Sequence, residues 1–218
     1  FTGWTGSNGT TPTNTVTIAK GSTGNRNYIA NWTPNTNIPY KVRHWTQNLG
    51  GKVDLKNEQN YTLIETENLV GTSDATITPE TKTTYEGFTA PNTQTVTIKT
   101  DGTLIVDYYY TRNKYKVTLN QGAGVSAVLG DGEYEYEQEV TINVMVKAGY
   151  DWVKWVGEGS ENRDLKVTFT MPAKNVEYET VTMANPNTKY TIQHWKQKLG
   201  GKVNEYNEEN YELAHTDV

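Results

Sequence analysis

One stretch of this chain occurs twice, at a constant offset of 150 residues. Segments 40–68 and 190–218 share 15 identities in 29 positions without a gap, from Tyr40 and Tyr190 onward. Self-similarity at a fixed period is typical of repeat architectures and constrains the fold more than any local pattern does. Because the second copy stops within the unit at Val218, we expect the chain to be a piece of a longer protein.

The composition favours strands in small modules. The hydrophobic fraction is only 34%, so each core must be thin, yet the chain contains 15 Tyr and 6 Trp and is rich in Thr. Aromatic and β-branched residues favour strands and are scarce in disordered segments. We therefore predict a mainly β protein, built from tandem small β-grasp-like modules in a linear, elongated array.

Charge, hydropathy and cysteine content narrow the possible partners and locations. The net charge is −5 with no long run of one sign, which argues against nucleic acid as a partner. No apolar stretch in the sequence is long enough to span a membrane. Cysteine is absent, whereas a small secreted eukaryotic domain would be expected to carry disulfides. These features favour the outside of a bacterial cell, particularly a Gram-positive one.

Turns and linkers divide the chain into four segments of two alternating types. Residues 1–34 are expected to be the C-terminal part of a type A β repeat, and residues 38–112 a complete type B β-grasp-like module. Residues 113–182 are expected to be a complete type A repeat, and residues 188–218 the N-terminal part of a second type B module. The linkers between them are short and contain proline, so neighbouring modules cannot separate far.

Alternation and turn signals predict the strands of the type B module. Tyr40–Trp45 alternates, with Tyr40, Val42 and His44 expected on one face. Segment 72–84 contains a proline and predicts either a short helix or an irregular crossover. Asp101-Gly102 predicts a hairpin between strands at 94–100 and 103–110.

The type A segments give similar signals. Thr15–Ala19 alternates and predicts a half-buried strand, while Ser7–Thr10 is expected to be a tight turn because it contains Asn-Gly. Asp131-Gly132 predicts a hairpin. Glu139–Val146 predicts a strand whose even-numbered residues share one face.

Particular residues carry a resemblance to known repeats. The type A segments resemble the Listeria–Bacteroides repeat and related bacterial surface repeats through Phe1-Thr2-Gly3-Trp4, Ala30-Asn31-Trp32, Gly149-Tyr150, Trp155 and Phe169-Thr170-Met171-Pro172-Ala173. The type B module resembles mucin-binding-protein-like (MucBP-like) and internalin B-repeat-like modules through Tyr40-Lys41-Val42, His44-Trp45, Leu49-Gly50-Gly51, Thr62-Leu63-Ile64-Glu65-Thr66, Tyr85-Glu86-Gly87-Phe88 and Tyr108-Tyr109-Tyr110-Thr111-Arg112-Asn113. The resemblance implies β-grasp-like folds and a secreted, cell-wall-associated parent protein.

Candidate catalytic and metal-binding residues are few. His44 and His194 occupy the same position in the two copies, which favours a scaffold role over catalysis, and His215 is expected at the surface. No His or Cys pair has the spacing of metal ligands. The acidic segment 130–139 could hold Ca²⁺ through oxygen ligands, although a solvated hairpin explains it better. We therefore assign no catalytic, cofactor-binding or metal-binding residue and expect no enzyme activity.

The carboxylates and the lysines raise two further kinds of chemistry. Carboxylate pairs such as Glu65 with Glu67, or Glu135 with Glu137, resemble a glycosidase pair only if a cleft surrounds them, and a solvated strand face is the favoured interpretation. A Lys–Asn or Lys–Asp isopeptide crosslink is also conceivable, but no spacing in the sequence marks a pair.

The aromatic residues leave two interpretations open. Trp45, Tyr109 and Trp152 could fill thin cores, or they could form a contact surface for a glycan or a protein. Core packing is favoured, and these three residues are the candidate ligand contacts of the alternative.

The sequence as a whole predicts a non-enzymatic repeat region of a bacterial surface protein or adhesin that acts as an extracellular stalk or spacer. Its expected partners are the neighbouring repeats of the same chain. The alternative is an adhesive module that binds host glycans, mucin or a host surface protein through exposed aromatic residues.

Overall fold

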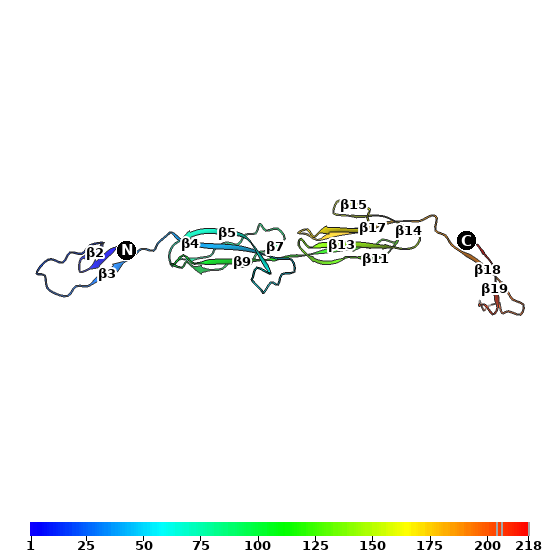
Figure 1. Ribbon diagram of the computed structural model, residues 1–218, viewed down its shortest axis with the longest axis horizontal. Coiled ribbons are helices and arrows are strands. Elements are labelled where there is room, and N and C mark those ends of the chain that lie inside the picture. The colour runs from blue at the N-terminus through cyan, green and yellow to red at the C-terminus, as the bar shows by residue number, and fades with distance from the viewer. Residues whose placement is uncertain (204, 206, 218) are drawn as a thin grey trace. The chain divides into compact units, whose positions relative to one another are not determined.

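The computed structural model describes residues 1–203, 205 and 207–217, which form strands, turns and loops without a helix (Figure 1). The prediction of a mainly β protein is confirmed. The chain divides into two compact units, Phe1–Lys114 with Glu135–Glu137, and Tyr115–Tyr134 with Gln138–Val218.

The N-terminal segment of the first unit is a three-stranded antiparallel sheet in the order β2-β1-β3. Its strands are β1 (Gly3–Gly6), β2 (Gly9–Thr13) and β3 (Tyr28–Asn31). The predicted Asn-Gly turn joins the first two strands, and Asn8 Nδ2 donates to the Trp4 carbonyl over 2.7 Å. Phe1 packs edge-on against Trp4 and Trp32, with ring centroids 5.4 and 5.3 Å apart.

The strand predicted at Thr15–Ala19 is wrong. These residues form no regular element, and Ile18 is 57% exposed. No strand of the sheet β2-β1-β3 pairs with these residues. Alternation indicates a strand only where a neighbouring strand pairs with it.

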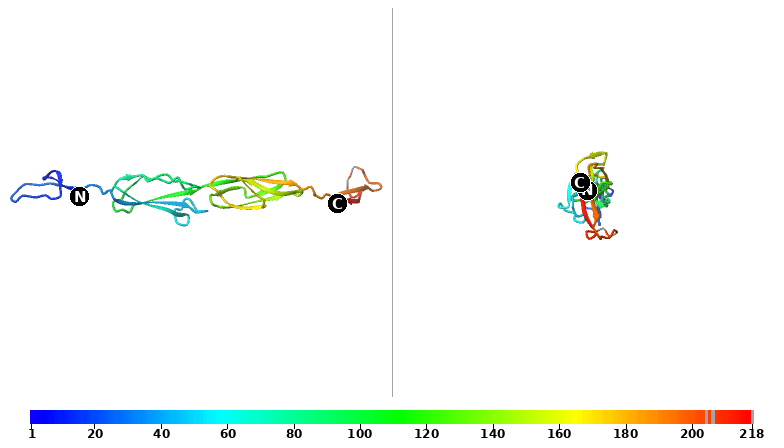
Figure 2. Two further views of the ribbon diagram at one scale, coloured as in Figure 1. Left: turned by 90° about the horizontal axis from the view of Figure 1, so that it is seen from above. Right: turned by 90° about the vertical axis from the view of Figure 1, so that its right-hand side faces the viewer.

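The centre of the first unit is a four-stranded sheet in the order β5-β4-β9-β7 (Figures 1 and 2). Its strands are β4 (Ile38–Gln47), β5 (Tyr61–Gly71), β7 (Phe88–Thr89) and β9 (Ile105–Arg112), and β6 (Thr76–Ile77) pairs separately with β8 (Val96–Thr97). Strand β4 is antiparallel to β5 and parallel to β9. The core on one face contains Ile38, Val42, Ile98, Leu104, Val106, Tyr108 and Tyr110. Segment 72–84 takes the irregular alternative and contains no helix.

The hairpin predicted at Asp101-Gly102 is also wrong, although the turn itself forms. The Gly102 amide donates to the Lys99 carbonyl over 3.1 Å, and Asp101 Oδ1 accepts from the Thr103 amide over 3.0 Å. The strands on either side belong to different sheets, because β8 pairs with β6 while β9 pairs with β4 and β7. Pairing with β4 places Val106 of β9 beside Val42 in the core.

The second unit contains two sheets whose faces share a core. One has five strands in the order β12-β10-β17-β14-β15, and the other has three in the order β11-β13-β16. Their bounds are β10 (Lys114–Asn120), β11 (Val125–Leu129), β12 (Gly132–Glu135), β13 (Glu139–Val146), β14 (Tyr150–Gly157), β15 (Ser160–Asn162), β16 (Lys166–Thr170) and β17 (Val176–Ala184). The shared core consists of Val117, Val125, Val140, Ile142, Val144, Trp155, Met171 and Val176. The strand predicted at Glu139–Val146 is confirmed, with its even-numbered residues facing inward.

The hairpin predicted at Asp131-Gly132 is wrong for a similar reason. The two-residue connection 130–131 carries the chain from one sheet to the other, since β11 pairs with β13 and β12 lies beside β10. A turn sequence specifies a reversal of direction, whereas the pairing of the strands depends on which faces the core buries.

The second copy of the repeated stretch forms the hairpin of β18 (Ile192–Gln197) and β19 (Tyr211–Asp217). Its register shifts between His194 and Trp195, as the register of β4 with β5 shifts between His44 and Trp45. The turns also match, because Asn60 Oδ1 accepts from the Lys52 amide and Asn210 Oδ1 from the Lys202 amide, each over 2.8 Å. Residues 204, 206 and 218 of the predicted second copy lie outside the described residues.

Candidate functional site

Two side-chain clusters occupy the two faces of β4 and β9. The first, which we call the Trp45 stack, consists of Arg43, Trp45, Lys56 and Tyr109. The parallel register places Trp45 opposite Tyr109, and their rings stack at 5.9 Å with an interplanar angle of 16°. The Arg43 guanidinium lies 5.2 Å from the Trp45 ring, and Lys56 Nζ lies 5.3 Å from the Tyr109 ring. Both separations are in the range of a cation–π interaction.

Asp107 fixes the geometry of the Trp45 stack. Its carboxylate accepts from Arg43 Nε and Nη2, each over 2.7 Å, and from Trp45 Nε1 over 2.8 Å. Burial by itself raises the pKa of the Asp107 carboxyl, but the hydrogen bonds from Arg43 and Trp45 outweigh this effect and hold the pKa below its usual value. The carboxylate therefore stays charged and orients both donors.

A surface groove of about 630 Å³ runs beside the stack. Its lining residues are Arg43, Trp45, Lys56, Asn57, Glu58, Gln59 and Tyr109. A groove of about 440 Å³ lies at the same position of the second copy, lined by Gln193, Trp195, Asn207, Glu208 and Tyr211. Four of these residues stand at the positions of Arg43, Trp45, Asn57 and Glu58, with Gln193 in place of Arg43. The β18–β19 hairpin has no third strand beside it in the described residues, so nothing there corresponds to Tyr109 of the first groove.

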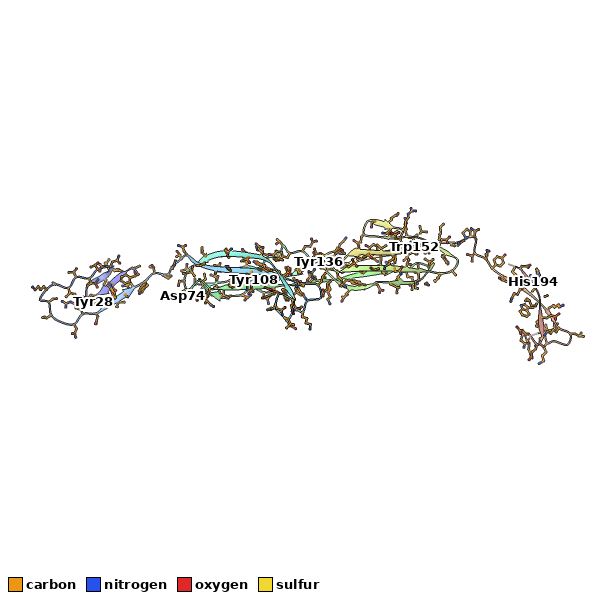
Figure 3. All side chains as sticks on the ribbon, in the orientation of Figure 1. Tyr28, Asp74, Tyr108, Tyr136, Trp152 and His194 are labelled. Carbon is orange, nitrogen blue, oxygen red and sulfur yellow. The ribbon has the colours of Figure 1, made fainter. Side chains whose placement is uncertain are left out.

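The structure brings two of the three predicted contact residues together. Trp45 is only 8% exposed and Tyr109 is half-buried, and each ring is covered by the other and by a cation. Trp152 lies in the second unit, where its Nε1 donates to the Arg163 carbonyl over 2.8 Å and its ring meets Trp155 edge-on (Figure 3). A role for any of the three in binding a ligand stays a prediction.

The sequence reasoning missed Asp107, Arg43 and Lys56. Asp107 and Tyr109 are two residues apart, as are Arg43 and Trp45, so each pair shares a strand face. That spacing predicts which residues share a face within each strand. It does not predict that β4 pairs with β9, because this pairing joins residues 64 positions apart.

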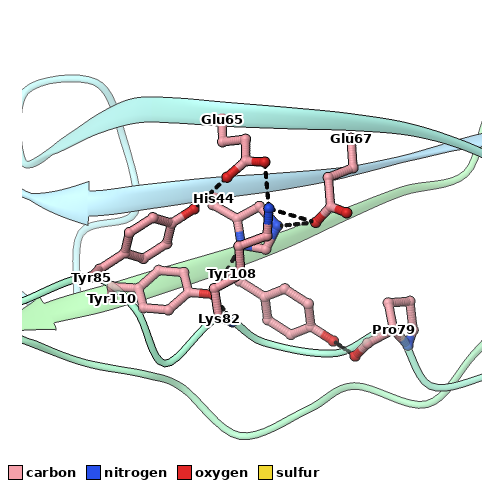
Figure 4. A network of polar contacts seen from close by, with 8 residues as sticks. All are labelled: His44, Glu65, Glu67, Pro79, Lys82, Tyr85, Tyr108 and Tyr110. Atoms are coloured by element: carbon pink, nitrogen blue, oxygen red, sulfur yellow. Dashed lines mark hydrogen bonds and ion pairs between the residues drawn. The ribbon is translucent and has the colours of Figure 1, made fainter.

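The second cluster lies on the opposite face and surrounds His44, which is fully buried (Figure 4). His44 Nδ1 lies 2.9 Å from the Tyr110 hydroxyl, and Nε2 lies 2.7 Å from Glu67 Oε1. The Tyr110 hydroxyl also accepts from the Lys82 amide over 2.7 Å. Both ring nitrogens are engaged, so the cluster connects β4, β5, β9 and the crossover segment. His194 repeats the pattern, with Nε2 2.9 Å from Asp217 Oδ2.

Glu65 and Lys82 form an ion pair at the edge of this cluster. The Tyr85 hydroxyl donates to Glu65 Oε2 over 2.7 Å, and Lys82 Nζ lies 3.4 Å from Glu67 Oε1. The hydrogen bond from Lys82 lowers the pKa of Glu65, and the same bond raises the pKa of Lys82. Burial, followed by the bond to Glu65, raises the pKa of Tyr85. The lysine amine is therefore held protonated, which does not favour it as the nucleophile of an isopeptide crosslink.

The described part of the chain contains neither a candidate metal site nor a helix that could span a membrane. Residues 1–203, 205 and 207–217 contain no group of three or more His, Asp or Glu side chains placed to hold a metal ion. Within the same residues, no helix is long and apolar enough to cross a membrane.

Comparison with known proteins gives one match. Residues 115–181 match the family model described as divergent InlB B-repeat domain. The comparison with curated proteins and the comparison with solved structures each found no match.

The match falls on the segment that the sequence analysis assigned to type A. The sequence predicts an internalin B-repeat-like module at residues 38–112, whereas the family match lies at residues 115–181, in the other module of the period. The MucBP-like resemblance and the alternation of two families stay predictions. Because the matched family occurs in extracellular bacterial surface proteins, the match supports a bacterial surface repeat region with an extracellular location.

Proposed function

We propose that this chain is a non-enzymatic repeat region of a wall-associated bacterial surface protein, and that it serves as an extracellular spacer. The observation that carries the proposal is the agreement between the two copies. The β18–β19 hairpin reproduces the register, the bulge and the turn contacts of the β4–β5 hairpin at an offset of 150 residues. A structural unit used again along one chain adds length in regular steps.

Separate cores support this role. The type B module and the type A module each have their own cluster of buried hydrophobic residues. In repeat arrays, stability is the sum of the stability of each unit and of its contacts with neighbours, so units can be added without redesigning a common core.

The linkers are tied to the modules that they border. The Asn35 carbonyl accepts from the Ser73 amide and the Gly149 carbonyl accepts from the Asn185 amide, each over 2.8 Å. Asn35 Oδ1 accepts from the Asn37 amide over 2.9 Å, and Asn185 Oδ1 accepts from the Asn187 amide over 2.8 Å. The same turn therefore occurs at both linkers, which limits their freedom and suits a spacer.

Small-angle X-ray scattering of the chain in solution tests the proposal. We expect the profile of a rod about three modules long, independent of protein concentration. A compact particle, or one that grows with concentration, contradicts the spacer and indicates that the module faces adhere to each other.

The groove beside Trp45 favours a second candidate, adhesion to a host glycan or protein. Glycan-array and mucin-binding measurements test it, with Lys56→Glu as the groove variant because Lys56 is exposed and lines the groove. Lys174→Glu, an exposed charge reversal in the second unit, is the matched control. Adhesion predicts binding that Lys56→Glu weakens and Lys174→Glu does not. Binding that is absent, or that both variants weaken equally, contradicts it.

A further inference from the structure

In both complete modules, the first strand and the last strand are hydrogen-bonded neighbours that run parallel to each other. In the type B module, β4 pairs with β9 over six consecutive residue pairs, from Lys41 with Ile105 to Thr46 with Tyr110 (Figure 1). In the type A module, β10 pairs with β17 over four, from Val117 with Val176 to Asn120 with Glu179. The two folds differ in strand order, so this shared feature does not follow from a common sheet topology.

The parallel arrangement determines how a module responds to a pull on its ends. The chain enters at the start of the first strand and leaves at the end of the last, so these points lie at opposite ends of the paired region. Hydrogen bonds between parallel strands are evenly spaced along the pair. Pulling slides one strand along the other and loads these bonds together, whereas an antiparallel pair pulled at one end opens one bond pair at a time.

Side chains reinforce the connection between β4 and β9. Asp107 on β9 accepts hydrogen bonds from Arg43 and Trp45 on β4, as described above. The Arg112 amide donates to Gln47 Oε1 over 2.9 Å, and Arg112 Nε donates to the Gln47 carbonyl over 3.0 Å. The two contacts between Arg112 and Gln47 lie at the end of the strand pair where the chain leaves the module, so they add to the resistance against sliding.

The pair β10–β17 has side-chain contacts of its own. Asn120 Nδ2 donates to Glu177 Oε1 over 2.6 Å, and the Thr180 hydroxyl donates to the Asn120 carbonyl over 3.1 Å. At the other end, Asn175 Oδ1 accepts from the Lys116 amide over 2.8 Å. Polar contacts thus fasten both ends of the paired region.

We propose that the β4–β9 and β10–β17 pairs are shear clamps, which keep each module folded while tension passes along the chain from its N-terminal to its C-terminal end. The proposal rests on the proposed spacer function and adds that the spacer transmits force, such as the drag of fluid on an attached cell.

Single-molecule force spectroscopy on the full chain tests the clamp. Because the chain has no cysteine, a pair of introduced cysteines defines where force is applied. Thr36→Cys with Lys114→Cys pulls β4 against β9 lengthwise. Thr36→Cys with Val70→Cys is the matched control, since Pro39 and Val70 are paired and force there opens the antiparallel β4–β5 ladder from its end. Val70 is 63% exposed, so the substitution disturbs no core.

The clamp predicts an unfolding force several times higher for the first pair of attachment points than for the second. Equal forces, or a lower force in the lengthwise direction, would overturn the proposal. If scattering shows a rod but the unfolding force is equal for both pairs of attachment points, the clamp is rejected and the spacer is kept. If scattering shows a compact particle but the lengthwise unfolding force is high, the spacer is rejected and the clamp is kept.

A side-chain substitution tests the same idea within one pulling direction. Asp107→Ala removes the acceptor that joins Arg43 and Trp45 to β9, and it is expected to lower the lengthwise unfolding force. Glu65→Ala removes contacts between β5 and the crossover segment and is expected to leave that force unchanged. Circular dichroism checks that both variants are folded. A lengthwise unfolding force that Glu65→Ala lowers more than Asp107→Ala does contradicts the clamp.

Discussion

Asp107 connects the two strands of the Trp45 stack, and it is only partly exposed. Replacing it with alanine leaves the Arg43 guanidinium and the Trp45 indole without their acceptor. Removing one partner of a buried hydrogen bond costs about 1–3 kcal/mol. Water can reach the partly exposed Arg43 guanidinium, so we expect Asp107→Ala to lower the free energy of unfolding of the type B module by about 2 kcal/mol. Urea denaturation of the full chain measures this loss, and an unchanged midpoint contradicts it.

The same carboxylate gives a pH dependence. The folded-state pKa of Asp107 lies below its ordinary value of 3.8, so its contribution is fully present above that value and is lost as the pH falls through the folded-state pKa. We expect the urea midpoint to fall as the pH is lowered below 3.8, and to fall less in Asp107→Asn. Asp131→Asn, at an exposed carboxylate, is the control. An Asp107→Asn chain as acid-sensitive as the natural one argues against this account.

Gly51 gives a prediction about the repeated turn. A Cβ added there would lie 2.6 Å from the Asn60 carbonyl oxygen, and one at Gly201 would lie 2.5 Å from the Asn210 carbonyl oxygen. Because both obstacles are backbone atoms, Gly51→Ala should destabilise the type B module by about 1–3 kcal/mol. The neighbouring Gly50 has a φ of 67° and open space around its Cβ position, so Gly50→Asn should cost much less. Equal losses in thermal denaturation contradict this explanation.

At the scale of elements, β13 shows where sequence patterns are reliable. Its alternation predicted which face is buried, and Ile142 is 0% exposed while Met145 on the other face is 54% exposed. We expect Ile142→Ala to cost about 2–5 kcal/mol because it leaves a cavity in the core of the second unit. Met145→Ala should cost less than about 0.5 kcal/mol. Denaturation followed by tryptophan fluorescence distinguishes the two, and similar losses would show that the faces are assigned incorrectly.

The pairing of strands was less predictable than their positions. Asp101-Gly102 forms a turn and Asp131-Gly132 lies at a short connection, but each joins strands of different sheets. A turn is encoded by a few adjacent residues, whereas strand partners are chosen by burial of faces that lie far apart in the sequence. For the same reason, the sequence identified Trp45 and Tyr109 as single candidates but not their cluster. The β4–β9 pairing that assembles the Trp45 stack joins distant segments.

At the scale of the whole molecule, the repeat carries the functional interpretation. The two copies agree in sequence and in local structure, and the module between them matches a family of bacterial surface repeats. In the proposed spacer, reach grows by adding periods, and the two proposed clamps would give each period a means of transmitting force. Neither property depends on a catalytic group.

The central claim is that each period adds length, and scattering from a chain in which residues 38–187 are duplicated in tandem tests it most directly. A module of about 75 residues is roughly 30 Å across, so a period of two modules should increase the maximum dimension by on the order of 60 Å over the chain with a single period. The cross-sectional radius should stay constant. A maximum dimension that does not grow, accompanied by a wider cross-section, would show that the modules fold back on one another and would contradict the spacer.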